Sequence, residues 1–227
     1  MIDLVTAYGV FADRGFRNDP LMILKVEDRN GTVLEKSMPH PTEVLSEQTT
    51  SVMTSMLQSV VDHGTGYPAR ARGFMNPAAG KTGTMDDYMD AWFVGFTPSM
   101  TCGVWVGYDQ KKTIGPGMTG AHAALPAWTD FMIGATRGKP VEDFPLPSGT
   151  VTREICAETG MLATENCPSV TTEMFDQGSE PTELCTSHPG PPLRQPQPGE
   201  TPTPTNGAGE DTEQPTGPPS PPGVRSY

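Results

Sequence analysis

A lysine, two threonines and a glycine stand together in the run Lys81-Thr82-Gly83-Thr84, which we call the KTGT segment (residues 81–84). The lysine supplies a positive charge, and the two hydroxyl groups donate and accept hydrogen bonds. Because glycine lacks a side chain, another chain can lie close to the backbone at Gly83. Acyl-transfer sites require such charges and hydrogen bonds, but a solvated strand edge contains the same residue types. The flanking sequence therefore decides between the two interpretations.

The cysteines are the second group of residues that could do chemistry: Cys102, Cys156, Cys167 and Cys185. An even number of cysteines, three of them in polar, loop-like sequence, favours disulfides in an oxidising compartment, and four cysteines allow three pairings. Three of them could instead form a zinc site with His188, but their spacing lacks the CxxC pair with which such sites usually begin. We therefore favour a disulfide, leave its pairing open, and predict no metal site and no cofactor.

Helical periodicity of the apolar residues predicts three helices around these groups. They cover residues 2–14, 46–63 and 121–136, with Ser46 as the N-cap of the second and Pro126 in the first turn of the third. The third helix is expected to bury one stripe of side chains: Leu125, Trp128, Phe131, Met132 and Ala135.

Three short β-type segments, residues 78–84, 91–97 and 101–108, follow one another with turn-prone sequence between them. The middle segment is apolar on both faces, which is typical of a central strand that is covered on both sides. We predict three adjacent antiparallel strands, with the helix at 121–136 as one cover. A separate small hairpin is predicted around Asn30-Gly31. Antiparallel strands covered by helices define an α+β fold.

The order of these motifs resembles the transpeptidase domain of class A penicillin-binding proteins. The segments that carry the resemblance are Gly80 to Thr84, Asp90 to Pro98 and Val104 to Gly107, with Thr6-Ala7-Tyr8, Phe11-Ala12 and Gly64-Thr65-Gly66 in addition. The resemblance covers roughly residues 1 to 140 and, more loosely, the cysteine-containing region beyond. It implies the α+β fold of the penicillin-binding and serine β-lactamase-like transpeptidases.

The resemblance also implies an activity, namely serine acyl transfer on D-alanyl-D-alanine stem peptides during peptidoglycan cross-linking, with β-lactams as substrate mimics. Lys81 would belong to the hydrogen-bond network around the nucleophile. Thr82 and Thr84 would bind the substrate carboxylate, and the backbone N–H of Thr84 would complete the oxyanion hole. Gly83 would let the substrate lie against the strand. Lys81 and Thr84 are thus the expected catalytic residues, and Thr82, Gly83 and Thr84 the expected substrate-binding residues.

Two further motifs of that family, SxxK with the nucleophilic serine and SxN, occur at none of the serines in the 227 residues. Because no acyl-enzyme forms without the serine, we predict that these residues alone are inactive and are the C-terminal part of a longer transpeptidase. The alternative is a non-catalytic cell-envelope binding module that keeps the KTGT segment. A small extracytoplasmic zinc module around residues 156–188 is a third interpretation.

Composition suggests three regions: residues 1–140 as the C-terminal portion of a transpeptidase domain, 141–188 as a cysteine-containing, loop-rich extension, and 189–227, rich in Pro and Gly, as a disordered tail. The formal net charge of -12 argues against a nucleic-acid partner. No apolar stretch approaches the roughly 20 residues that a membrane-spanning helix needs. The resemblance implies a periplasmic protein, with an inner-membrane anchor expected only in a preceding part of the protein.

Overall fold

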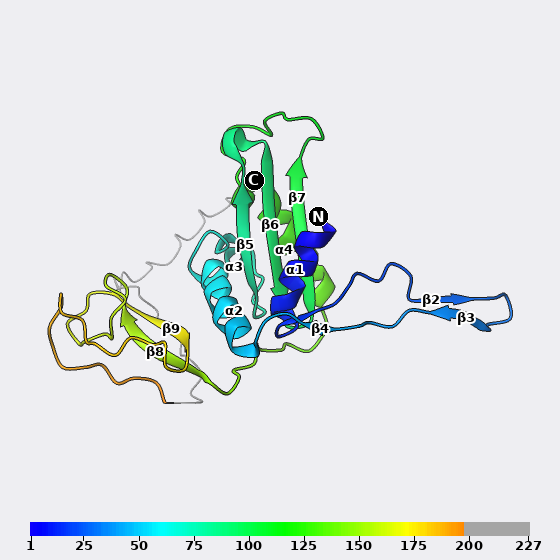
Figure 1. Ribbon diagram of the computed structural model, residues 1–227. Helices are drawn as coiled ribbons and strands as arrows, with labels where there is room; N and C mark the ends of the chain where they lie inside the picture. Colours follow the sequence, from blue (N-terminus) through cyan, green and yellow to red (C-terminus); the bar gives the residue numbers. More distant parts are fainter. Residues whose placement is uncertain (198–227) are drawn as a thin grey trace, which may run out of the picture.

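The computed structural model describes residues 1–197, and it contains a three-stranded sheet with helices on both faces (Figure 1). The helices are α1 (Ile2–Ala12), α2 (Glu47–Asp62), α3 (Pro68–Ala71), the 3-10 turn η1 (Asp86–Tyr88), the π-helical turn η2 (Gly120–Ala124) and α4 (Leu125–Thr136). The strands are β1 (Phe16–Arg17), β2 (Lys25–Glu27), β3 (Val33–Lys36), β4 (Thr42–Glu43), β5 (Ala79–Thr84), β6 (Asp90–Thr97), β7 (Met100–Gly107), β8 (Thr150–Cys156) and β9 (Val170–Asp176).

The central sheet has the strand order β5-β6-β7, and both pairings are antiparallel. β5 pairs with β6 from Ala79 opposite Phe96 to Thr84 opposite Ala91. The prediction of three adjacent antiparallel strands is confirmed. Because β6 is the middle strand, β5 is an edge strand, and the KTGT segment therefore lies at an edge of this sheet.

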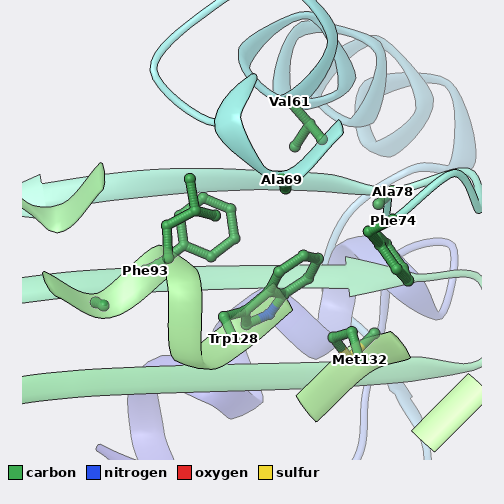
Figure 2. Close-up of a cluster of buried hydrophobic side chains, with 9 residues drawn as sticks. Val61, Ala69, Phe74, Ala78, Phe93, Trp128 and Met132 are labelled. Atoms are coloured by element: carbon green, nitrogen blue, oxygen red, sulfur yellow. The ribbon is translucent and has the colours of Figure 1, made fainter. Parts of the chain in front are cut away.

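Helices cover both faces of β6, as its apolar sequence predicted. On one face, Phe93 packs edge-on against Trp128 of α4, with the ring centroids 4.9 Å apart. Trp128 also contacts Phe74, and both pairs belong to the buried cluster in Figure 2. On the other face, Phe96 stacks on Phe11 of α1 at a centroid distance of 6.4 Å. α1 and α4 thus lie on opposite sides of the sheet (Figure 1).

The predicted helix at 121–136 begins as the π-helical turn η2 and continues as α4, with Pro126 in the first turn of α4. Its buried residues differ in part from the predicted stripe. Phe131 is wrong as a core residue, because 55% of it is exposed. The residues that α4 buries follow the steps i, i+3, i+4 and i+7, and Phe131 falls outside this stripe. They are Leu125, Trp128, Thr129 and Met132.

The predicted cap and turn residues occupy the positions expected of them. Ser46 is the N-cap of α2, and its side chain accepts a hydrogen bond from the backbone N–H of Thr49 at 3.2 Å. Gly31 has a positive φ of 84° in the turn between β2 and β3. This hairpin projects away from the central sheet (Figure 1).

Residues 141–188, the extension, contain more regular structure than predicted. β8 and β9 pair along their whole length, from Thr150 opposite Asp176 to Cys156 opposite Val170. Because most of their side chains are half-buried on both faces, the two strands lack the alternation by which strands are predicted. The extension lies against α2, where the side-chain amide of Gln48 donates to the carbonyl of Ser148 at 3.1 Å.

The first residues of the segment predicted as a tail are hydrogen-bonded to the extension. The side-chain amide of Gln195 accepts from the backbone N–H of Glu154 at 2.8 Å and donates to its carbonyl. The backbone N–H of Leu193 donates to Ala163 at 3.2 Å. Residues 198–227, the rest of the predicted tail, lie outside the described residues. Within residues 1–197, none of the helices combines the length and apolar character needed to cross a membrane.

Candidate functional site

The four residues of the KTGT segment lie on alternate faces of β5. Lys81 is opposite Val94 and Gly83 is opposite Trp92, whereas Thr82 and Thr84 are opposite Phe93 and Ala91 on β6. Successive side chains of a strand point to opposite faces. The lysine and the glycine therefore share one face, the two threonines share the other, and all four contribute backbone to the strand edge.

Lys81 keeps its charged group at the surface. Its side chain is exposed, and the Nζ atom donates to the carbonyl oxygen of Thr82 at 3.1 Å. The structure gives this ammonium group no carboxylate within salt-bridge distance among the described residues. Its positive charge is thus available for an anionic group that approaches the edge of β5.

The hydroxyl group of Thr82 has a partner that comes from outside the sheet. The Oγ1 atoms of Thr82 and Thr65 lie 2.7 Å apart, which is a hydrogen-bond distance. Thr65 lies in the turn between α2 and α3, where the backbone N–H of Gly66 donates to the carbonyl of Val60 in α2. The turn after α2 therefore positions a second hydroxyl group beside the KTGT segment.

Thr84 contacts the turn that precedes α4. Its Oγ1 atom accepts a hydrogen bond from the backbone N–H of Gly120 at 3.0 Å. Gly120 lies so close to the sheet that a Cβ atom added there would be 2.4 Å from the carbonyl oxygen of Trp92 and 2.6 Å from that of Gly83. Only a residue without a side chain fits this position, so Gly120 allows η2 to hold the end of β5.

Gly83 packs against Trp92, which lies on the same face of the sheet as Trp105. A Cβ atom added at Gly83 would lie 3.2 Å from the Cβ of Trp92. Trp92 contacts Trp105 on β7 at a centroid distance of 6.2 Å, and the indole N–H of Trp105 donates to Asp90 at 2.8 Å. Through these contacts, the two tryptophans pack on the sheet and support the strand at Gly83.

A hollow of about 600 Å³ lies elsewhere, between α1, α2 and the extension. The residues that line it include Thr50, Ser51 and Thr54 of α2 and Phe144 and Met174 of the extension. None of the described residues that line it belongs to β5. This hollow and the KTGT segment are thus different places on the molecule, and the chemical groups of the KTGT segment make it the candidate site.

The extension holds a second cluster of reactive side chains. Cys156, Cys167, Cys185 and His188 all offer a ligand atom within 4.8 Å of one another, and the four cysteines of the chain are free thiols in the structure. The side-chain hydroxyl of Thr159 and nearby backbone N–H groups lower the pKa of Cys156 to about 6 against the opposing effect of burial. Burial raises the pKa of Cys167.

Comparison with known proteins gives the family. The model of the penicillin-binding protein transpeptidase domain matches residues 1–132, and the model of the C-terminal domain of penicillin-binding protein 1A matches residues 146–190. The first match alone covers more than half of the chain. The protein therefore belongs to the penicillin-binding protein transpeptidase family, as the resemblance of its motifs predicted.

Individual relatives agree with this family. Penicillin-binding protein 1A of Aquifex aeolicus is 45% identical over 184 residues, which cover 81% of this chain and 25% of the relative. The crystal structure of penicillin-binding protein 1A from Haemophilus influenzae has a TM-score of 0.74 at 26% identity and is matched over 81% of this chain and 32% of its own. PonA1 of Mycobacterium tuberculosis has a TM-score of 0.58 at 27% identity, over 64% and 40% of the two chains. The chain thus spans about a quarter of the curated relative and about a third of the Haemophilus structure.

The predicted site residues are only part of the arrangement that the structure shows. Sequence reasoning placed Lys81 to Thr84 on one strand, which the structure confirms, while their catalytic roles remain predictions. It assigned no role to Thr65, although the motif Gly64-Thr65-Gly66 was a signal. It also missed Gly120, for which the sequence offers no signal, because its contacts are made with a strand far away in the chain.

Proposed function

We propose that residues 1–140 form one side of a peptidoglycan D,D-transpeptidase site, which performs serine acyl transfer on D-alanyl-D-alanine stem peptides. The observation that carries this proposal is the position of the KTGT segment on the edge strand β5. An edge strand has main-chain groups that do not pair within its sheet. An extended stem peptide, or a β-lactam that mimics it, can therefore bind along β5 as an additional strand.

The side chains of β5 suit the charges of that reaction. Lys81 brings an exposed ammonium group, which favours negative charge at the site. The hydroxyl groups of Thr82 and Thr84 would bind the terminal carboxylate of the peptide, and the backbone N–H of Thr84 would stabilise the oxyanion of the tetrahedral intermediate. Gly83 would allow close approach of the substrate backbone. These roles support one another because one short strand presents all of the groups.

The nucleophile of the proposed reaction has to come from residues other than these 227. No serine in the sequence is followed by a lysine three positions later, and none begins an SxN motif. In the proposed enzyme, the nucleophile and its base lie in a preceding part of the same protein, which is anchored in the inner membrane and faces the periplasm. Residues 141–188 then form an extension to this domain.

The first experiment reads the gene in frame upstream of the Met1 codon and expresses the complete product. We expect SxxK followed by SxN, and covalent labelling of that serine by a fluorescent penicillin. Purified residues 1–227 serve as the matched control, which should remain unlabelled under the same conditions. Labelling of residues 1–227 would contradict the assignment of the nucleophile.

A stop codon close upstream would favour the alternative, a binding module without catalysis. In that case the 227-residue chain should bind a D-alanyl-D-alanine peptide reversibly, and Lys81→Ala should weaken the binding. An unlabelled complete product that also fails to bind the peptide would overturn both interpretations of the KTGT segment.

A further inference from the structure

Three cysteines and one histidine from separate segments of the extension converge at one point. Cys156 is the last residue of β8, Cys167 lies in the loop before β9, and Cys185 and His188 follow β9. Their ligand atoms all lie within 4.8 Å of one another. We propose that these four residues bind one zinc ion, which serves as a structural crosslink of the extension.

The distances at the cluster match a tetrahedral ion. The Nδ1 atom of His188 lies 3.6 Å from the Sγ of Cys156 and 3.4 Å from the Sγ of Cys185. Zinc binds thiolate sulfur at about 2.3 Å and imidazole nitrogen at about 2.0–2.1 Å, so two such ligands on a tetrahedral ion are about 3.6 Å apart. A hydrogen bond would explain one of the two contacts, but it would not gather three thiols around one imidazole. Three soft sulfur ligands and one imidazole select zinc over magnesium or calcium.

The histidine is oriented as a metal ligand. Its Nδ1 atom faces the sulfur atoms, and its Nε2 atom lies 3.4 Å from a carboxylate oxygen of Glu158. Histidines that bind metals commonly donate their other ring N–H to a carboxylate, which fixes the ring and the tautomer. Glu158 lies two positions after Cys156, so the same loop supplies one ligand and the partner of another.

The sulfur atoms also receive hydrogen bonds from their surroundings. The hydroxyl group of Thr159 donates to the Sγ of Cys185 at 3.4 Å, and the backbone N–H of Thr164 donates to the Sγ of Cys167 at 3.3 Å. Such bonds stabilise the thiolate form, which is the form that binds metal. The hydroxyl group of the buried Thr164 in turn donates to the carbonyl of His188. Each ligand segment is thus connected to a neighbouring one.

A disulfide is the competing use of these thiols, and it was the prediction from the sequence. Cys102 lies in β7, on the other side of α2 from the extension (Figure 1), and is no partner for the cluster. Three thiols then remain, and a disulfide would use two of them and leave one beside His188. Zinc uses all four groups. The cysteines contain no CxxC pair. Cys185 and His188 are three positions apart, however, and form a ligand pair with the same spacing.

The extension also needs a crosslink for its stability. Its fully buried side chains are few and small: Cys156, Ala163, Thr164 and Cys185. A two-stranded sheet with so small a core is marginal by itself, and small modules of this kind are commonly stabilised by disulfides or metal ions. A zinc ion at the cluster would join the end of β8 to both loops that surround it.

The test measures the metal content of the purified 227-residue chain after expression with added zinc. We expect one zinc ion per chain, measured by elemental mass spectrometry. After replacement by Co²⁺, we expect the thiolate-to-metal charge-transfer and d–d bands of tetrahedral coordination. Protein without metal would overturn the proposal, whether its intact mass shows three free thiols at the cluster or a disulfide among them.

Matched variants separate coordination from folding. His188→Ala should lose the metal, whereas His188→Cys should retain it, because a fourth thiolate completes an all-cysteine zinc site. Cys102→Ala should keep one zinc ion, since that cysteine lies outside the cluster. Glu158→Gln should weaken zinc affinity roughly tenfold in competition with a chromophoric chelator. Retention of full affinity by His188→Ala would overturn the ligand assignment, and none of these measurements depends on penicillin labelling.

Discussion

The hydroxyl oxygen of Thr65 lies 2.7 Å from that of Thr82, although the two residues are 17 positions apart in the chain. The contact orients the hydroxyl group that we propose for binding the substrate carboxylate. Thr65→Val should slow acylation of the complete protein by a fluorescent penicillin about fivefold, the equivalent of one neutral hydrogen bond of about 1 kcal/mol. Thr65→Ser should react at nearly the rate of the parent protein. Equal rates for the valine and serine variants would show that the contact has no role in the reaction.

Gly120 should not tolerate even the smallest side chain. In Gly120→Ala the added Cβ atom meets main-chain oxygen atoms of Trp92 and Gly83 at 2.4 and 2.6 Å, which cannot rotate away. We expect a loss of about 1–3 kcal/mol in the free energy of unfolding, measured by urea denaturation of the 227-residue chain.

Gly134 in α4 is the matched control, because an added Cβ atom would have no neighbour within 4 Å. Gly134→Ala should stabilise the chain by about 0.5–1 kcal/mol, since alanine favours the helix. If Gly120→Ala were as stable as Gly134→Ala, the close packing of η2 on β5 would be disproved.

Trp128 of α4 should be essential to the core, whereas Phe131 of the same helix should not be. Trp128 is fully buried, and its indole N–H donates to the carbonyl of Cys102 at 3.1 Å. Trp128→Ala should cost about 3–5 kcal/mol of stability through the cavity that it leaves. Phe131→Ala, at a position that is 55% exposed, should change the free energy of unfolding by less than about 0.5 kcal/mol. A larger effect would support the prediction from the sequence that Phe131 is one of the buried residues of this helix.

Arg70 and Arg72 on and beside α3 should respond differently to the same substitution. The Nη1 atom of Arg70 donates to the carbonyls of Phe74 and Asn76 at 2.8 and 2.7 Å, and its Nε atom donates to Asp62. Lysine has a single nitrogen and cannot make these bonds together. Arg70→Lys should therefore cost about 1–3 kcal/mol.

Arg72 provides the control for this prediction. Its side chain pairs with the carboxylate of Asp130 at 3.2 Å, and both side chains are largely exposed. Exposed ion pairs contribute about 0–1 kcal/mol. The melting temperatures of the two variants give the comparison. A melting temperature for Arg72→Lys as low as that for Arg70→Lys would contradict the role of the partly buried hydrogen bonds of Arg70.

The elements of the central sheet could be predicted from the sequence because their patterns are local. The run from Ala91 to Phe96 is apolar on both faces, which requires cover on both sides, and Ser46 is the residue type that caps a helix. The strands β8 and β9 could not be predicted in this way. Their side chains are half-buried on both faces, so neither face is clearly apolar.

The sequence by itself determined the family, the strand order and the identity of the KTGT segment, because these depend on motifs and on apolar runs within a few positions of one another. Only the tertiary structure decided which groups surround that segment and which cysteines meet. Thr65 reaches Thr82, and Gly120 reaches Gly83, by the packing of turns on the sheet. His188 joins three cysteines because loops fold around the end of β8. Contacts between distant segments depend on the packing of the whole chain, and local patterns in a single sequence carry no direct record of them.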